Sequence, residues 1–282
     1  MDTRNLDGKV GVVTGAGSGI GRSTALALAE RGADLAVCDI NEADLAATAD
    51  ALKALGRRVY SERVDVAEAS EMQHFAEATR TELGRVDIVV NNAGIGIAGL
   101  FVEVPLDAWN RILGINIRGV VHGCHAFLPG MIEAGQGGHI VNIASMAGYC
   151  QAPGMTAYGA TKFAVLGFSE SLRLELEAHK IGVTAICPGV INTAIVRTSA
   201  TYGVNDDPEM RAEGIRAFER RNYSPDRVAR GILKAIAKNR GVAPISPEAW
   251  AGYWLKRLFP GAVAWLGRRA AAAQRDRLAQ TG

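Results

Sequence analysis

The chain has 282 residues, of which 31 are Lys or Arg and 29 are Asp or Glu, and its formal net charge at pH 7 is +2. Hydrophobic residues make up 48% of the chain and charged residues 21%, a composition typical of a globular protein with a sizeable core. Because the charges are balanced and interspersed, the sequence lacks the basic stripe that favours binding to nucleic acid.

Short apolar runs alternate along the chain with longer segments whose apolar residues recur at helical spacing. The longer segments include residues 22–31, 42–55 and 68–83, which are rich in Ala, Leu and Glu. The apolar runs predict strands at residues 10–14, 35–39, 59–64, 88–90, 139–143, 183–187 and 242–245. Strands that alternate with helices form βαβ units, so the predicted fold class is α/β: a doubly wound, mostly parallel sheet of the Rossmann type with helices on both faces.

Two regions depart from this alternation. Residues 194–224 are polar, and we interpret them as a mobile lid over a site. Residues 248–282 hold three of the four tryptophans and place Trp250, Trp254 and Leu258 at helical spacing near basic residues. Packing within the chain or against another subunit is the favoured interpretation of this tail, and contact with a membrane surface is the alternative.

The four cysteines, Cys38, Cys124, Cys150 and Cys187, are widely spaced and form no CxxC pair. Cys38 and Cys187 lie in apolar runs, which indicates buried, reduced thiols of a cytoplasmic protein. Residues 1–9 are polar and do not resemble a secretion signal, and the sequence lacks an apolar run of about 18 residues.

A glycine-rich segment, residues 14–21, follows the first predicted strand and opens the first predicted helix. Glycines permit a tight turn and let backbone N–H groups approach a pyrophosphate, which the helix N-terminus also favours. A strand-to-helix turn without a ligand is the alternative. The residues predicted to contact a dinucleotide here are Gly15, Ser18, Gly19, Ile20 and Gly21.

Asp39 ends the second predicted strand, eighteen positions after Gly21. Its carboxylate is suited to accept hydrogen bonds from the adenosine ribose and would repel a 2′-phosphate, and its neighbour Ile40 provides no cation. NAD is therefore the predicted cofactor. Arg22 is the one nearby cation and leaves open whether NADP is also accepted.

Further motifs follow in order along residues 9–193, and through them the chain resembles the short-chain dehydrogenase/reductase family. The motifs are the nucleotide loop at residues 14–21, Asp65 with Val66, the Asn-Asn-Ala-Gly element at residues 91–94, Asn116, Ser145, Tyr158-x-x-x-Lys162, Pro188 with Gly189, and Thr193. The resemblance implies an adenine contact at Asp65 and Val66. It also implies a nicotinamide-ribose side lined by Asn92, Ala93 and Gly94, and carboxamide and phosphate contacts at Pro188, Gly189, Ile191 and Thr193.

Tyr158 and Lys162 are four residues apart, so on a helix their side chains share a face. A free phenol has a pKa of about 10, and an ammonium group about 4 Å away would lower the pKa by up to about three units. We therefore expect Tyr158 to act as the acid/base, with Lys162 lowering its pKa and binding the cofactor. The resemblance implies that Ser145 hydrogen-bonds the substrate oxygen and that Asn116 holds a water that relays protons to Lys162.

Several of these residues also have plainer interpretations. Asn116 lies in an apolar run and could belong to a structural hydrogen-bond network. His122 and His125 are three residues apart, but no carboxylate or thiol joins them at ligand spacing, so we predict helix packing or a subunit contact and no metal site. Cys150, five residues after Ser145, is not expected to be a nucleophile.

The predicted function is an NAD(H)-dependent oxidoreductase that interconverts a secondary alcohol and a ketone, or another alcohol/carbonyl pair, on a hydrophobic small molecule. The alternatives are an NAD(H)-sensing regulator and a scaffold protein without turnover. Residues 1–247 are predicted to form the NAD(H)-binding catalytic Rossmann domain, with residues 248–282 as an aromatic and basic helical extension of the same domain.

The walls of the substrate pocket are predicted at residues 95–101, 146–155 and 190–202, which are largely apolar. Residues 187–242 also resemble the dehydrogenase half of certain bacterial fusions with an epoxide hydrolase, a likeness that suggests a lipid-like substrate. A homodimer or homotetramer is expected, because in the proteins that this chain resembles the two helices near residues 116–131 and 158–178 form a subunit interface. Both helices carry apolar residues on more than one face, such as Val120, Val121, Phe127, Phe163 and Phe168.

Overall fold

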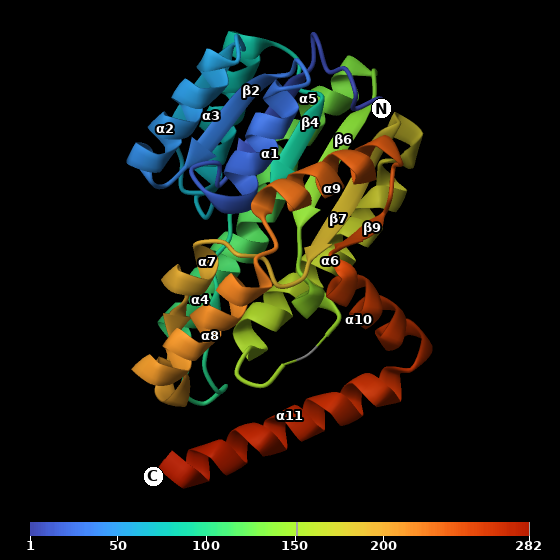
Figure 1. Cartoon of the computed structure of the whole chain (residues 1–282). Helices are drawn as coiled ribbons and strands as arrows, with labels where there is room; N and C mark the ends of the chain where they lie inside the picture. The colour runs from blue at the N-terminus through green and yellow to red at the C-terminus, as the bar shows by residue number, and fades with distance from the viewer. Residues whose placement is uncertain (151, 282) are drawn as a thin grey trace.

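The computed structural model describes residues 1–150 and 152–281 (Figure 1). Within these residues, seven strands form one parallel sheet in the order β3–β2–β1–β4–β6–β7–β9. The strands are β1 Val10–Thr14, β2 Asp34–Asp39, β3 Val59–Arg63, β4 Ile88–Asn91, β6 Gly138–Ile143, β7 Ile181–Pro188 and β9 Val242–Ile245. All seven predicted strands are present, each within two residues of its predicted bounds.

Helices cover both faces of the sheet, which confirms the predicted doubly wound fold. One face packs against α1 Gly19–Ala29, α2 Glu42–Ala54 and α9 Pro225–Ala237. The other packs against α3 Ala69–Leu83, α5 Gly119–Ala134 and α6 Thr156–Glu175. Central strands such as β1 and β7 are buried along their whole length because both their faces are covered, and this is why they are continuously apolar and do not alternate.

The strand order reverses between β1 and β4. The chain leaves β1 toward β2 and β3 on one side, and leaves β4 toward β6, β7 and β9 on the other. In open α/β sheets a ligand crevice lies at such a reversal, at the carboxyl ends of the strands. The segments that follow β1 and β4 are residues 14–21 and 91–94, so the fold brings two of the predicted cofactor motifs to this point.

Residues 194–224 are more regular than a polar lid suggests. They contain α7 Ile195–Thr198, the short strand β8 Ala200–Thr201 and α8 Pro208–Arg221. The Asp207 side chain caps α8 by accepting hydrogen bonds from the backbone N–H groups of Glu209 and Met210. The strand β8 pairs in parallel with β5 Ile97–Ala98, and the sequence did not predict this small second sheet. That the region moves as a lid stays a prediction.

The helices expected to face another subunit are only partly exposed. Val121 on α5 and Phe163 on α6 are exposed, whereas Val120 and Phe127 are buried in the core against the sheet. Helix α5 therefore carries apolar residues on more than one face, one that packs on the sheet and one that is exposed. Leu174 on α6 is an exposed apolar side chain that was not named.

The C-terminal segment forms two helices, α10 Pro247–Leu258 and α11 Pro260–Thr281, with a break at Phe259. Helix α10 lies beside the turn that follows β6, where the Tyr149 hydroxyl donates a 2.8 Å hydrogen bond to the Ala249 carbonyl. Helix α11 packs mainly on α10 and projects away from the rest of the chain (Figure 1). Among the described helices, none is long and apolar enough to cross a membrane.

Candidate active site

Ser145, Tyr158 and Lys162 meet beyond the carboxyl end of β6. Ser145 follows β6 in extended backbone, and its hydroxyl accepts a 3.1 Å hydrogen bond from Ala147 N–H, which caps the short helical turn Met146–Gly148. The chain then returns as α6, which carries Tyr158 and Lys162 on one face. The Ser145 and Tyr158 side chains are hydrogen-bonded to each other. The structure thus brings these three predicted catalytic residues together, and the fourth, Asn116, lies near Lys162 beside Gly94.

Burial controls the titration of Tyr158. It raises the pKa of the phenol above its ordinary value, and the hydrogen bond with Ser145 opposes that rise. The net pKa of Tyr158 is therefore raised, where a fall had been expected from the charge of Lys162. The spacing of four residues correctly placed the two side chains on one face, but spacing does not reveal how strongly the site excludes water.

Lys162 is itself buried, and its ammonium nitrogen lies 5.7 Å from the centre of the Tyr158 ring. It donates a 2.8 Å hydrogen bond to the carbonyl oxygen of Ile143, the last residue of β6. Burial lowers the pKa of Lys162 to about 8, with the nearby Cys187 thiol opposing the change. An ammonium group has three N–H donors, so one fixes Lys162 to the sheet and two make no hydrogen bond to the described residues.

Asn116 is buried in a π-helical turn, Gly114–Arg118, between α4 Leu106–Leu113 and α5. Its amide nitrogen donates to the Ile95 carbonyl at 3.0 Å and to the Thr161 hydroxyl at 3.1 Å, and its amide oxygen accepts from Ile95 N–H at 2.9 Å. Both amide hydrogens are thus used by the protein. This arrangement favours the network interpretation of Asn116 over a water held by its amide nitrogen. Such π-helical turns are frequent at functional sites, and no sequence signal was found for this one.

The glycine-rich segment is built around contacts that a larger residue would break. A Cβ atom on Gly21 would lie 2.1 Å from the Gly15 carbonyl oxygen, and Gly15 has a φ of +64° that favours glycine. Ser18, the first residue before α1, makes no side-chain cap hydrogen bond to the described residues. By contrast, Asn41 caps α2 through its side chain. The N-terminal N–H groups of α1 therefore suit an anionic ligand, as the sequence predicted.

Two carboxylates converge beside this segment. Asp39 accepts hydrogen bonds from Gly17 N–H at 2.8 Å and from Asn41 N–H at 3.0 Å. A Cβ atom on Gly17 would lie 3.0 Å both from a carboxylate oxygen of Asp39 and from the Cβ atom of Asp44. Asp44 was not predicted as a site residue, because it lies in the first turn of α2 and only the fold brings it here. The neighbouring Ile40 is exposed.

The Asn-Asn-Ala-Gly element fixes the glycine-rich segment in place. The Asn92 side chain donates hydrogen bonds to the carbonyl oxygens of Thr14 and Gly15, at 2.9 and 3.0 Å. The Thr14 hydroxyl in turn accepts from the backbone N–H groups of Asn92 and Ala93. The Asn92 side chain therefore fixes the turn that follows β1. Gly94 is the member of the element that lies nearest the catalytic group, since a Cβ atom there would be 3.6 Å from Lys162 Nζ.

Asp65 and Val66 follow the carboxyl end of β3, at the same end of the sheet as the glycine-rich segment. The Asp65 carboxylate accepts a 2.9 Å hydrogen bond from Ala67 N–H, while Val66 is buried against Gly119 of α5. The His122 ring contacts the Val66 carbonyl at 2.9 Å, so this histidine takes part in helix packing. Among the described residues, no group of three His, Cys, Asp or Glu side chains could hold a metal ion.

The segment after β7 is held by a residue that the sequence did not single out. Glu248, on α10, accepts a 3.1 Å hydrogen bond from Val190 N–H and a 2.9 Å hydrogen bond from the Arg221 guanidinium at the end of α8. Burial favours its protonated form, but these partners outweigh it and hold the pKa of Glu248 below its ordinary value. Farther along the segment, Ile191 is buried and Thr193 lies against Gly19 of the glycine-rich segment. Pro188 is the last residue of β7, and Gly189 donates a hydrogen bond to the Ile245 carbonyl.

The three segments predicted as pocket walls come together next to Tyr158, except that residue 151 lies outside the described residues. The pairing of β5 with β8 joins the first wall to the third, and a 2.8 Å hydrogen bond from Gly99 N–H to the Gly154 carbonyl joins the first to the second. The apolar cluster that Tyr158 packs against comprises Ile95, Ile97, Val104, Ala108, Trp109, Ile112, Ala157, Ala200 and Tyr202.

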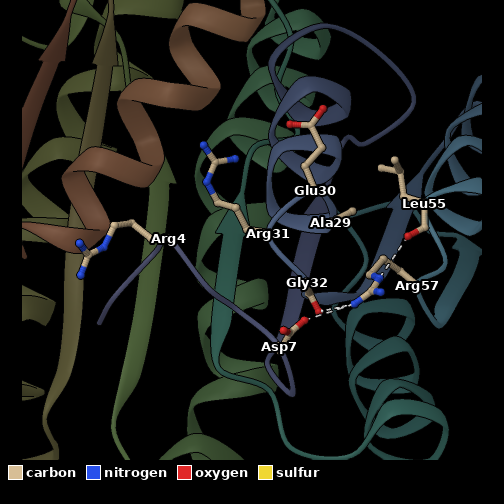
Figure 2. A pocket seen from close by; sticks show the side chains of 8 residues that line it. All are labelled: Arg4, Asp7, Ala29, Glu30, Arg31, Gly32, Leu55 and Arg57. Atoms are coloured by element: carbon tan, nitrogen blue, oxygen red, sulfur yellow. Dashed lines mark hydrogen bonds and ion pairs between the residues drawn. The ribbon is translucent and has the colours of Figure 1, made fainter.

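A cavity of about 400 Å³ lies elsewhere, at the amino ends of the strands (Figure 2). Its lining residues precede β1, β2 and β3, and the Arg57 guanidinium crosses it to the Gly32 carbonyl at 2.9 Å and to the Asp7 carboxylate at 3.6 Å. This cavity is thus separate from the predicted catalytic residues, which lie at the opposite ends of the strands.

Comparison with known proteins agrees with this geometry. A family model described as "short chain dehydrogenase" matches residues 9–202. The protein named "Probable oxidoreductase EphD" from Mycobacterium tuberculosis is 45% identical over 255 residues, covering 89% of this chain and 43% of EphD. The chain therefore spans less than half the length of that relative.

Two solved structures share the fold and contain a dinucleotide. A short chain dehydrogenase/reductase from Burkholderia phymatum in complex with NAD is 33% identical, with a TM-score of 0.81, and the match covers 90% of this chain and 94% of that one. A short chain dehydrogenase from Mycobacterium paratuberculosis bound to NAD is 26% identical, with a TM-score of 0.75, and covers 86% of this chain and 97% of that one.

Proposed function

The chain belongs to the short-chain dehydrogenase family, and on that basis we propose that it interconverts a secondary alcohol and a ketone, with NAD(H) as the hydride carrier and Tyr158 as the acid/base. The observation that carries the proposal is the convergence of Tyr158, Ser145 and Lys162 at the carboxyl end of β6. The site has one hydroxyl to bind the substrate oxygen, one to exchange its proton, and a buried cation behind them.

The cofactor assignment is supported by the fit of the chain around a dinucleotide. The uncapped N-terminus of α1 would hold the pyrophosphate, and the glycines leave room for its close approach. Asp39 would accept hydrogen bonds from the adenosine ribose, and Asp39 and Asp44 together would repel a 2′-phosphate. Gly94 and the segment from Pro188 to Thr193 would border the nicotinamide half.

In the direction of oxidation, Ser145 would donate a hydrogen bond to the substrate oxygen while Tyr158 removes the hydroxyl proton. When bound, NAD⁺ accepts the hydride from the carbinol carbon, and its positive ring favours the phenolate form of Tyr158. Lys162, with two free N–H donors on a buried ammonium group, would stabilise that phenolate and bind a ribose hydroxyl. In the direction of reduction, the raised pKa of Tyr158 keeps the phenol protonated and ready to donate.

The substrate is proposed to be hydrophobic. The side chains that pack around Tyr158 are mainly aliphatic or aromatic, including Ile97, Trp109 and Tyr202, so a polar substrate would lose hydrogen bonds to water without replacement.

A panel of secondary alcohols and the matching ketones, offered with NAD⁺ or NADH and followed by NADH absorbance, tests the proposal. We expect turnover of hydrophobic members of the panel. Tight NADH binding by calorimetry with no turnover of any compound, in either direction, would instead support a regulator or a scaffold protein.

A further inference from the structure

The helices α10 and α11 expose large apolar side chains to solvent. Five of them, Trp254, Leu258, Phe259, Trp265 and Leu266, are between 49% and 63% exposed. Others on the same helices are covered: Val263 is buried, and Trp250 packs against Tyr253 and the Arg240 guanidinium. Both helices thus carry large apolar side chains that the rest of the described chain leaves uncovered. Exposed apolar side chains in such number mark an interaction surface. We call α10 and α11 together the C-terminal arm.

Basic side chains flank these apolar groups. Residues 248–282 contain six Lys or Arg and two Asp or Glu, whereas residues 1–247 contain 25 and 27. The arm is therefore cationic and the rest of the chain slightly anionic. The Arg269 guanidinium lies 4.8 Å from the Trp265 ring centre, and the Arg257 guanidinium lies 4.8 Å from the Tyr253 ring centre. Aromatic rings with adjoining cations are typical of helices that lie in a membrane interface.

The arm lies beyond the carboxyl ends of the strands, at the same end of the molecule as α4 and α8 (Figure 1). A second set of exposed apolar side chains immediately precedes and begins α4: Phe101 is 64% exposed, Val102 is 88% exposed and Leu106 is 80% exposed. Two separate apolar surfaces are thus presented at the end of the sheet where Ser145 and Tyr158 lie.

We propose that the C-terminal arm docks on the anionic surface of a phospholipid bilayer, with Trp254 and Trp265 at the level of the headgroups and with Arg268 and Arg269 on the lipid phosphates. The arm lies in the interface and does not cross the bilayer. Pairing of the arm with the arm of a second copy fits this surface less well, because it would bring Arg268 and Arg269 of each copy toward cations of the other. Anionic headgroups complement the same charges.

Co-sedimentation of the full chain with vesicles tests this surface independently of any turnover. We expect binding to vesicles that mix phosphatidylglycerol with phosphatidylcholine, weak binding to phosphatidylcholine alone, and release as salt is raised. Trp265→Ser combined with Leu266→Ser should also weaken binding, since it removes the apolar contact and leaves the charge.

A matched pair of charge variants separates a defined surface from general electrostatics. Arg268→Glu with Arg269→Glu should weaken binding to anionic vesicles at least about tenfold, because each basic residue near such a surface contributes about fivefold. Lys53→Glu with Lys238→Glu makes the same change in net charge on exposed residues at the end of α2 and after α9, and should bind nearly as the unmodified chain does. Turnover of a water-soluble substrate should be unchanged in all these variants.

Three outcomes would overturn the proposal. One is the absence of co-sedimentation with anionic vesicles at low salt, and another is equal weakening by both charge variants. The third is a change from dimer to monomer in the Trp265→Ser, Leu266→Ser variant without vesicles, which would assign the arm to a second copy of the chain.

Discussion

The Lys162 ammonium nitrogen lies 5.7 Å from the centre of the Tyr158 ring while its 2.8 Å hydrogen bond runs to the carbonyl oxygen of Ile143. The cation is therefore held by the end of β6 and presented to the face of the phenol. Position and protonation in this pair are set by the sheet as well as by the helix that carries both residues.

Tyr158→Phe removes one hydroxyl from a side chain whose ring stays packed, so folding and NADH binding should be nearly unchanged. A positioned acid/base contributes about 100- to 10,000-fold, and turnover should fall by at least the lower figure. Steady-state kinetics on an alcohol found in the panel measures this. Lys162→Ala should lose turnover and also weaken NADH binding, and Ser145→Ala should mainly lower kcat. A Tyr158→Phe enzyme that keeps more than about a tenth of the activity would remove Tyr158 from the chemistry.

Asp39→Asn should reduce the preference for NADH over NADPH, because the amide keeps a hydrogen-bond acceptor for Gly17 N–H but loses the charge. A charge about 4 Å from a phosphate is worth about 1 kcal/mol in a water-like environment, so the ratio of the two Kd values should change by about fivefold. Adding Asp44→Asn should change the ratio of the two Kd values further. Calorimetry with both cofactors gives the ratio, and equal affinities in the unmodified protein would contradict the assignment of NAD.

Glu248→Ala should raise the KM for NADH with little effect on kcat, because Glu248 holds the segment after β7 through Val190 N–H and touches no reacting atom. Loss of a hydrogen bond to a charged group costs about 1.5–3 kcal/mol, so an increase of about tenfold or more is expected. Glu248→Gln keeps an acceptor for Val190 N–H, so its KM for NADH should lie between those of the unmodified chain and of Glu248→Ala. Arg221→Ala serves as a second control, since it leaves the Val190 bond intact. An unchanged KM in Glu248→Ala would show that the segment is held by other contacts.

His139 makes stability depend on pH. The Thr184 hydroxyl donates to the Arg240 carbonyl, so Thr184 Oγ accepts from His139 Nε2–H at 2.8 Å. Burial, with Arg173 adding to it, lowers the pKa of His139 to about 3. Between this value and about 6.5 only the unfolded chain binds the proton, so the free energy of unfolding falls as the pH falls, by about 1.4 kcal/mol per pH unit.

Urea unfolding of the unmodified chain and of His139→Val across this pH range tests the point. The unfolding free energy of the unmodified chain minus that of His139→Val should decrease as the pH falls. His125→Gln, at an exposed position, is the control and should follow the unmodified chain. A difference that stays constant with pH would mean that His139 is protonated in the folded state.

Assembly is proposed to involve the exposed apolar side chains of α5 and α6, Val121, Phe163 and Leu174. We expect a homodimer or homotetramer by sedimentation velocity, and Phe163→Glu should shift it toward smaller species by placing a charge in an apolar contact. Leu55→Glu, on an exposed leucine that follows α2, should leave the assembly unchanged. A monomer at micromolar concentration would contradict the proposed interface.

The sequence alone was enough to predict every strand of the large sheet. Strands buried on both faces must be continuously apolar, as in β1 and β7, and helices with one buried face must show helical periodicity, so both signals are local and readable. The glycines at 15 and 21 and the Tyr158–Lys162 spacing are local in the same sense, because each depends on backbone geometry within a few residues.

Contacts between distant segments were decided only by the tertiary structure. The convergence of Asp44 on Gly17, the hold of Glu248 on Val190 and the pairing of β5 with β8 join residues whose own neighbours in sequence give no hint of a partner. The rise in the pKa of Tyr158 belongs here too. The charge of Lys162 could be read from the sequence. The loss of water around the phenol, however, depends on side chains from β5, α4 and β8 that only folding brings together. The effect of this burial on the pKa of Tyr158 outweighs the effect expected from the spacing of Tyr158 and Lys162.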